Sequence, residues 1–285
     1  PRGRFPRVPL YDGGGVFVEV RGGVARVPGG GRVAGIFTQS WIDGAPSREK
    51  ARAALGGEID GVAAQFAAFD EQGVVLAPVH LSDEEAATLP CAAVTAWNAL
   101  VHQGGVKAGD SVLLLGTGGV SLFALQFSRL LGARVILTSS SDEKLARGKE
   151  LGASVLVNYR SHPDWEKRVL DVTGGEGVDT VVEVGGAGTL AKSLRAVRVG
   201  GCIALIGVLS GGGDVNPMPV IMRSIQVRGV FVGSRAMFEE MNRAIELHGL
   251  RPVVDRVFEF DELPAALRHM ESGAHFGKIV VRLSD

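Results

Sequence analysis

A short segment, DSVLLLGTGGVS, limits the possible folds of this chain more than any other. It contains an apolar run, Val112 to Leu115, with the composition of a buried parallel strand. Three glycines follow within the next four positions, and then an apolar segment from Val120 to Leu131 has the length of a helix. A strand, a glycine turn and a helix in this order predict the first unit of a doubly wound α/β sheet.

In such a unit the glycine turn can bind the pyrophosphate of a dinucleotide. Gly116 permits a tight turn, and Gly118 lets the backbone approach the phosphates. The helix that begins near Val120 directs free N–H groups and the positive end of its dipole toward them. The pattern G-x-G-x-x-G is incomplete because Ser121 replaces the third glycine. A turn with only a structural role is therefore the alternative.

The alternation of strands and helices continues after this unit. Apolar runs typical of strands lie at 134–138, 154–157, 178–184, 202–207 and 227–232, separated by helical patterns. Together with the first strand they make six, the number found in a doubly wound dinucleotide-binding sheet.

The first part of the chain has a different character. It is rich in turns, and we expect β-strands at 16–20, 32–37, 61–69 and 73–76. Ser82 and Glu85 predict a capping box at the start of a helix that Pro90 interrupts, before a second helix from 91 to 101.

The change of pattern near residue 89 predicts a domain boundary. We expect a substrate domain at 1–88, completed by 252–285, and a dinucleotide-binding domain at 89–251. In the C-terminal part, strand-like runs at 257–260 and 278–283 flank a helix at 263–271.

Charge and cysteine content exclude several classes of partner. The formal net charge is −1, which gives no electrostatic reason to expect nucleic acid or an anionic membrane as a partner. Cys91 and Cys202 lie far apart and form neither a disulfide framework nor a metal-ligand cluster. With no signal peptide and no bilayer-spanning apolar run, the expected setting is the reducing cytoplasm.

The segment after the second strand of the sheet indicates which dinucleotide is bound. An acidic residue about twenty positions after the glycine turn would bind the adenosine ribose and favour NAD. That place holds Ser139 and Ser140, with Lys144 one helical turn later, and hydroxyls with a cation suit the 2′-phosphate of NADP(H). In the alternative, the serines only cap the next helix. Asp142 could also stand in for the missing acid.

No other residues form a convincing catalytic or metal site. Cys91 has His80 and His102 nearby in sequence, but not at the spacing of zinc ligands, and a zinc site needs three or four ligands. Asp43 and the pair Asp70–Glu71 are expected to have turn and loop roles. The sequence identifies no general acid.

Several motifs occur in the order typical of one known family: LPCAAVTAW at 89–97, GTGGVS at 116–121, Asn158-Tyr159, VEVG at 182–185 and GKIVV at 277–281. Together they resemble the medium-chain dehydrogenase/reductase superfamily, in particular its zinc-independent alcohol dehydrogenase-like and quinone oxidoreductase-like branch. The resemblance extends from about Pro9 to the C-terminus and is densest between 81 and 207.

The resemblance implies a Rossmann domain beside a GroES-like β-domain. The implied activity is hydride transfer between NADP(H) and an enone, quinone, aldehyde or alcohol, in a protein that is usually a homodimer paired through an edge strand of the Rossmann sheet. Expected cofactor contacts are Gly116, Thr117, Gly118, Gly119 and Val120 for the pyrophosphate, Ser139, Ser140, Lys144 and Tyr159 for the 2′-phosphate, and Thr95, Gly207, Val208, Phe231 and Val232 for the nicotinamide half.

Two departures from the family pattern affect these expectations. Zinc-using members have His-Glu where this chain has Tyr11-Asp12, and they carry a four-cysteine loop that this sequence lacks, so we expect no metal. Family members also open with several dozen residues that are not in this sequence, so the substrate domain is expected to be partial. A non-catalytic NADPH-binding sensor or structural protein is therefore a second hypothesis. A methyltransferase is a third, which the six-strand alternation and the serine–lysine cluster disfavour.

Overall fold

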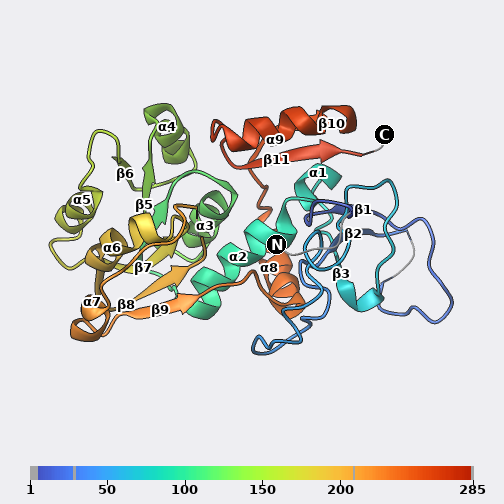
Figure 1. Ribbon diagram of the computed structural model, residues 1–285, viewed down its shortest axis with the longest axis horizontal. Coiled ribbons are helices and arrows are strands. Elements are labelled where there is room, and N and C mark those ends of the chain that lie inside the picture. The colour runs from blue at the N-terminus through green and yellow to red at the C-terminus, as the bar shows by residue number, and fades with distance from the viewer. Residues whose placement is uncertain (1–5, 28–29, 208, 284–285) are drawn as a thin grey trace. The chain divides into compact units, whose positions relative to one another are not determined.

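The computed structural model of the protein describes residues 6–27, 30–207 and 209–283 (Figure 1). The chain divides into two compact units. One consists of Pro1–Val94 together with Val232–Asp285, and the other of Thr95–Phe231.

The second unit contains a six-stranded parallel sheet with the order β6-β5-β4-β7-β8-β9. This is the doubly wound, Rossmann-type order, so the predicted fold class is confirmed. The six strands lie close to the predicted runs: β4 (Ser111–Leu115), β5 (Arg134–Ser139), β6 (Val155–Asn158), β7 (Val178–Glu183), β8 (Val197–Leu205) and β9 (Gln226–Gly229).

Helices connect successive strands of this sheet: α3 (Gly119–Leu130), α4 (Asp142–Glu150), α5 (Trp165–Val172), α6 (Ala187–Ala196) and α7 (Met218–Met222). One core cluster joins Leu113 of β4 and Val181 of β7 to Trp165 and Val169 of α5 and to Leu194 of α6. Helices α5 and α6 therefore share a face of the sheet. Central strands such as β4 are buried, which explains why continuous apolar runs identified them.

The first unit contains two small sheets. Strands β1 (Gly14–Val16), β2 (Arg32–Gly35) and β3 (Val74–Leu76) are antiparallel, with the 3-10 turn η1 (Glu71–Gly73) leading into β3. Strands β10 (Val254–Glu259) and β11 (Lys278–Arg282) pair in parallel. The 3-10 turn η4 (Phe260–Glu262) and helix α9 (Leu263–Glu271) connect them.

Helix α8 (Arg235–His248) belongs to the first unit, although the domain boundary was expected only at 252. The helix packs against β3, and Asn242 Nδ2 donates to the backbone oxygen of Leu76 at 2.9 Å. Its contacts therefore assign it to the β-rich unit.

Two strand predictions in the first unit differ from the structure. The run expected at 16–20 is a strand only at Val16, because β1 spans Gly14–Val16. Residues 61–69 do not form a strand; instead Gly61 N and Val62 N donate to the carbonyls of Val8 and Leu10. The break expected at Pro90 is confirmed: the first helix ends at Ala86, and Pro90 lies in the first turn of the next segment, the π-helical η2 (Leu89–Ala93), where its missing N–H is not needed.

The helical path around this proline is composite. Helix α1 (Asp83–Ala86) begins with the predicted capping box between Ser82 and Glu85. After η2, helix α2 (Val94–Trp97) continues into the π-helical segment η3 (Asn98–Gln103).

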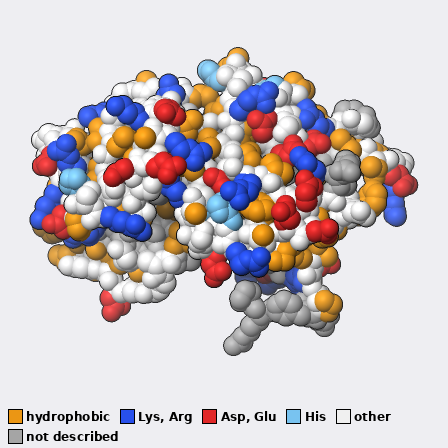
Figure 2. Space-filling model, turned by 90° about the horizontal axis from the view of Figure 1, so that it is seen from above, with side chains coloured by type: hydrophobic (Ala, Val, Ile, Leu, Met, Phe, Trp, Pro, Cys, Tyr) orange, Lys and Arg blue, Asp and Glu red, His pale blue; other side chains and the backbone are white. Residues whose placement is uncertain are grey.

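The surface shows no segregation of charge on the face drawn in Figure 2, where basic and acidic side chains intermingle. This agrees with the formal net charge of −1. Within the described part of the chain, no helix combines the length and apolar character required to span a bilayer.

We expect Asp179→Asn to destabilise the second unit by about 1–3 kcal/mol at neutral pH. Asp179 lies near the amino end of β7, where its carboxylate accepts from Ser111 N at 2.7 Å, Ser111 Oγ at 2.9 Å and Arg198 Nε at 2.6 Å. Burial alone would raise the pKa of Asp179, but these hydrogen bonds outweigh burial and lower the pKa below its ordinary value.

Because the folded-state pKa is lowered, the stabilisation is present above the ordinary pKa and is lost as the pH falls through the lowered value. Urea unfolding at a series of pH values should therefore give a shallower acid-induced loss of stability for Asp179→Asn than for wild type. Asp164→Asn, in the exposed pair with Lys167, is the control and should change little. Equal effects of the two substitutions would contradict the prediction.

Candidate functional site

The strand order reverses between β4 and β7 in the second unit. From β4 the chain continues to β5 on one side, and later returns through β7 to β9 on the other. In an open α/β sheet, ligands bind outside the carboxyl ends of the strands at such a switch point. The loop after β4, at 116–118, and the loop after β7, at 184–186, flank this position.

The glycine turn after β4 forms an open cradle. Gly116 has a φ of +76° and donates its N–H to Thr138 Oγ1 at 3.2 Å, while the Thr117 side chain is buried. Gly118 is the N-cap of α3 and offers no side-chain cap, so Gly119 and Val120 form a first turn with N–H groups available to a ligand. A Cβ added at Gly116 or Gly118 would meet no heavy atom within 4 Å. The turn therefore fits a pyrophosphate.

Ser121, the departure from the glycine pattern, has a defined structural role. Its side chain is 1% exposed, and its Oγ donates to the backbone oxygen of Leu115 at 2.7 Å. The hydroxyl ties the first turn of α3 to the end of β4. A small side chain thus preserves the close helix–strand packing that the third glycine would permit.

At the carboxyl end of β5 the serines have different roles. Ser141 is the N-cap of α4 and accepts from Lys144 N at 3.3 Å, so capping does occur here. Ser139 is 3% exposed, and its Oγ accepts from Ser141 N at 3.3 Å. Ser140 and Lys144 are half-buried.

The neighbouring strand β6 brings two further side chains to the same end of the sheet. Tyr159 is 41% exposed, and its N–H donates to the backbone oxygen of Ser139 at 3.0 Å. Asn158 Nδ2 donates to Asp142 Oδ1 at 2.7 Å. In the sequence, the motif Asn158-Tyr159 led to Tyr159 as an expected contact of the 2′-phosphate, but gave no sign of the hydrogen bond between Asn158 and Asp142.

The residues expected near the nicotinamide are divided between the two units. Thr95, Gly207 and Phe231 belong to the second unit and Val232 to the first, while Val208 lies outside the described residues. Thr95 is 2% exposed and Phe231 is 52% exposed. Val232 has a φ of +52°, a strained value for a β-branched residue and one that tends to occur at functional sites. These contacts remain predictions.

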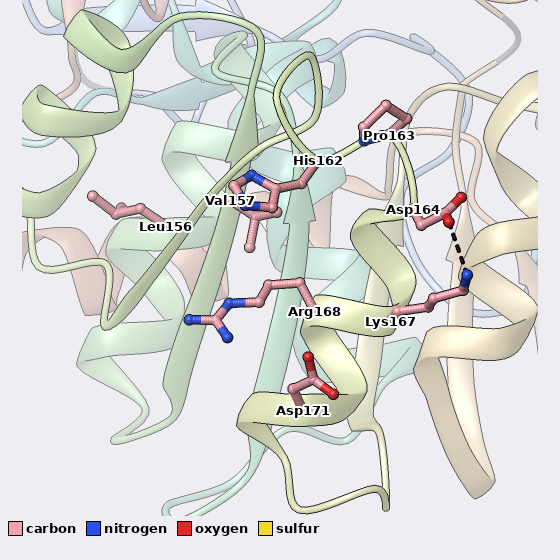
Figure 3. Close-up of a pocket in the computed structure, with 8 residues that line it drawn as sticks. All are labelled: Leu156, Val157, His162, Pro163, Asp164, Lys167, Arg168 and Asp171. Atoms are coloured by element: carbon pink, nitrogen blue, oxygen red, sulfur yellow. Dashed lines mark hydrogen bonds and ion pairs between the residues drawn. The ribbon is translucent and has the colours of Figure 1, made fainter.

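A hollow of about 540 Å³ lies beside edge strand β6 and helix α5 (Figure 3). It is lined by Leu156, Val157, His162, Pro163, Asp164, Lys167, Arg168 and Asp171. Lys167 Nζ is 2.8 Å from Asp164 Oδ2 in an exposed ion pair. None of the expected cofactor contacts lines this hollow, so it is separate from the glycine cradle.

The first unit contains a second cluster of polar groups around Tyr11 and Asp12. Lys278 Nζ on β11 lies 2.8 Å from Asp12 Oδ2, with the two side chains 21% and 13% exposed. Burial alone would lower the pKa of Lys278, but the Asp12 carboxylate outweighs burial and raises it. Partial burial raises the pKa of the Tyr11 phenol, and the neighbouring Cys91 and Asp12 act in the same direction.

The remaining polar candidates have structural roles. Asp43 Oδ1 accepts from Gly44 N at 2.6 Å, and Asp70 caps η1 through Gln72 N at 2.8 Å. Glu71 accepts from the amides of Ala25 and Arg26. Among the described residues, no group of three or more His, Cys, Asp or Glu side chains could hold a metal ion.

Comparison with known proteins gives a consistent result. Residues 119–247 match the family described as zinc-binding dehydrogenase. A zinc-type alcohol dehydrogenase-like protein of Schizosaccharomyces pombe is 43% identical over 98% of this chain and 83% of its own length. A quinone oxidoreductase of Pongo abelii is 26% identical over 98% of this chain and 80% of its own length.

Solved structures agree in fold. A crystal structure of an NAD-dependent alcohol dehydrogenase superposes with a TM-score of 0.89 and 34% sequence identity. The match covers 100% of this chain and 85% of that protein.

We expect Gly118→Val to weaken dinucleotide binding without destabilising the protein. The backbone φ of −79° accepts any L-residue, and the added side chain would enter the open space of the cradle. Overpacking costs about 1–3 kcal/mol, which corresponds to a loss of affinity between roughly fivefold and roughly 150-fold. Fluorescence titration with NADPH and NADH, alongside thermal unfolding, measures both effects.

Gly22→Val is the matched control, because a Cβ at Gly22 also meets nothing within 4 Å and lies in the other unit. It should leave both dinucleotide affinity and unfolding temperature unchanged. Unaltered binding by Gly118→Val would mean that the glycine turn is only structural.

Proposed function

Because the chain belongs to the medium-chain dehydrogenase/reductase superfamily, and is an oxidoreductase that uses a nicotinamide cofactor, we propose that it transfers hydride between NADP(H) and a carbonyl, enone, quinone or alcohol. The open glycine cradle at the β4–β7 switch point is the observation that carries this proposal. The cofactor supplies the hydride chemistry when it is bound.

The protein contributes binding and orientation. The amides of the first turn of α3 bind the pyrophosphate, and the absence of side chains at Gly116 and Gly118 lets it approach the backbone. The β-rich first unit is the proposed substrate domain, and Thr95, Gly207, Val208, Phe231 and Val232 are the proposed contacts of the nicotinamide half.

The preference for NADP(H) is supported by the groups at the ends of β5 and β6. Ser139, Ser140, Lys144 and Tyr159 provide hydroxyls and a cation, which stabilise a phosphate. The carboxylate considered as a replacement for the missing ribose-binding acid is that of Asp142, and it accepts a hydrogen bond from Asn158 Nδ2 at 2.7 Å. Asp142 is thereby drawn toward β6.

Independence of zinc is supported by the ion pair in the first unit. Asp12 occupies the position of the second residue of the His-Glu pair, and its carboxylate is bound to the ammonium of Lys278. A cationic side chain already neutralises this carboxylate, so a divalent ion beside it would meet charge repulsion. Cys91 and Cys202 are thiols that form no disulfide with each other, which agrees with the proposed reducing, cytoplasmic setting.

The central test combines cofactor titration with a panel of enones, quinones, aldehydes and alcohols. Wild type should bind NADPH more tightly than NADH and oxidise it with at least one substrate. Lys144→Glu should weaken NADPH binding at least about tenfold, or about 1.4 kcal/mol, relative to NADH, because a carboxylate would face the 2′-phosphate.

Lys149→Glu, on the exposed part of the same helix, is the control and should keep the preference for NADPH. Equal losses for both dinucleotides in Lys144→Glu would remove Lys144 from the 2′-phosphate site. Tight NADPH binding without turnover of any substrate would favour the non-catalytic alternative.

We also propose a homodimer paired through β9. This strand is at the edge of the sheet and is exposed along its length, which leaves backbone groups available for pairing with a second copy. Ile221 and Met222 of the preceding helix α7 are 68% and 74% exposed and would pack at the same interface.

Sedimentation velocity should therefore find a dimer, which Met222→Lys shifts toward monomer by placing a charge in the interface. Leu247→Lys, at an 80% exposed position on α8, should leave the dimer intact. A monomeric wild type at micromolar concentration would refute this assembly.

A further inference from the structure

Glu183 is a fully buried carboxylate at the carboxyl end of β7. Its side chain is 0% exposed, yet no basic side chain pairs with it among the described residues. Oε1 accepts from Gly185 N at 2.8 Å, Gly186 N at 3.1 Å and Thr189 Oγ1 at 2.6 Å. Oε2 accepts from Ser193 Oγ. Two amides and two hydroxyls therefore satisfy the charge.

The backbone of Glu183 organises the next loop as well. Its carbonyl oxygen accepts from Ile206 N at 2.9 Å and Gly207 N at 3.1 Å, immediately after β8. Ser210 Oγ donates to Gly185 O at 2.8 Å and accepts from Gly188 N at 2.7 Å. The loops after β7 and β8 thus form one hydrogen-bonded network around Glu183.

This network leaves little room for adjustment. A Cβ at Gly185 would lie 2.3 Å from Thr189 Oγ1, and one at Gly207 would lie 1.7 Å from the backbone oxygen of Val184. Gly186 has a φ of +89°. Close backbone approach therefore holds the loop at 184–186 in one conformation.

We propose that Glu183 is a positioning residue for the dinucleotide: through the loop at 184–186 it fixes the side of the switch-point crevice that faces the glycine turn. Strands β4 and β7 are neighbours, so this loop and the cradle at 116–118 leave the sheet side by side. Glu183 is buried, and its effect reaches the cofactor through the conformation in which it holds the loop amides of Gly185 and Gly186. This inference rests on the proposed function.

The two carboxylate oxygens have separable roles. Oε1 accepts from the amides of Gly185 and Gly186 and from Thr189, whereas among the described residues Oε2 accepts from Ser193, one turn further along α6. In Glu183→Gln the amide oxygen can keep the position of Oε1, and the new NH₂ group can donate to Ser193 Oγ. Glu183→Leu removes every acceptor and leaves the buried loop amides without partners.

The experiment compares NADPH affinity, the KM for NADPH and unfolding temperature in four variants of the full chain. Glu183→Leu should weaken NADPH binding at least about tenfold and raise its KM, with kcat at saturating NADPH largely retained. Glu183→Gln should rescue affinity to within about threefold of wild type. Thr189→Val, on the Oε1 side, should weaken binding, while Ser193→Ala should lower only the unfolding temperature.

Comparison of Thr189→Val with Ser193→Ala tests the proposal even if Glu183→Leu does not fold. If Glu183 had only a structural role, the two substitutions would have the same effect on NADPH affinity. The inference is overturned if folded Glu183→Leu binds NADPH as wild type does, or if Ser193→Ala weakens binding as much as Thr189→Val. Absence of nicotinamide binding by wild type would instead overturn the proposed function, and the inference with it.

Discussion

The pairing of β4 with β7 is the constraint on which the rest of the second unit depends. Val112, Leu113 and Leu114 face Thr180, Val181 and Val182 across this parallel pair, which is fully buried. The strand order reverses here, so chain connections leave on opposite sides and open a crevice at the carboxyl ends. Hydrogen-bonded carboxylates stabilise both ends of β7, with Asp179 on Ser111 at one end and Glu183 under the loop at the other.

The two carboxylates differ in what they contribute. Asp179 is partly exposed and pairs with Arg198, so it resembles an ordinary structural ion pair. Glu183 is shielded from water and is satisfied entirely by neutral donors that converge from a loop and a helix. Burying a carboxylate is costly unless its oxygens accept hydrogen bonds. Glu183 therefore stabilises the loop only in a conformation that supplies these donors.

Much of the second unit was predictable because its signals are local. Runs such as Val112 to Leu115 are apolar because parallel strands are covered on both faces, and Gly116 and Gly118 mark the turn that follows. The roles of Ser121 and Asn158 were not predictable, because each depends on a partner that only the folded backbone brings near.

The first unit was harder to predict for a related reason. Its strands are short, and segments such as 61–63 satisfy their backbone groups through the irregular stretch at 8–10 instead of a sheet ladder. An apolar segment of this length has the composition of a strand, which does not distinguish a sheet ladder from hydrogen bonds to an irregular stretch. Pro90 was a reliable signal there, because a proline fits the first turn of a new helical segment and not the interior of a continuous one.

The ion pair between Asp12 and Lys278 joins residues 266 positions apart. The first unit is assembled from both ends of the chain, whereas the second is a single continuous segment. A ribosome therefore releases all of Thr95–Phe231 before it synthesises β11, and the continuous unit can fold while its neighbour still lacks a strand. During that interval Asp12 lacks the ammonium of Lys278, so the first unit is completed only after β11 has been made.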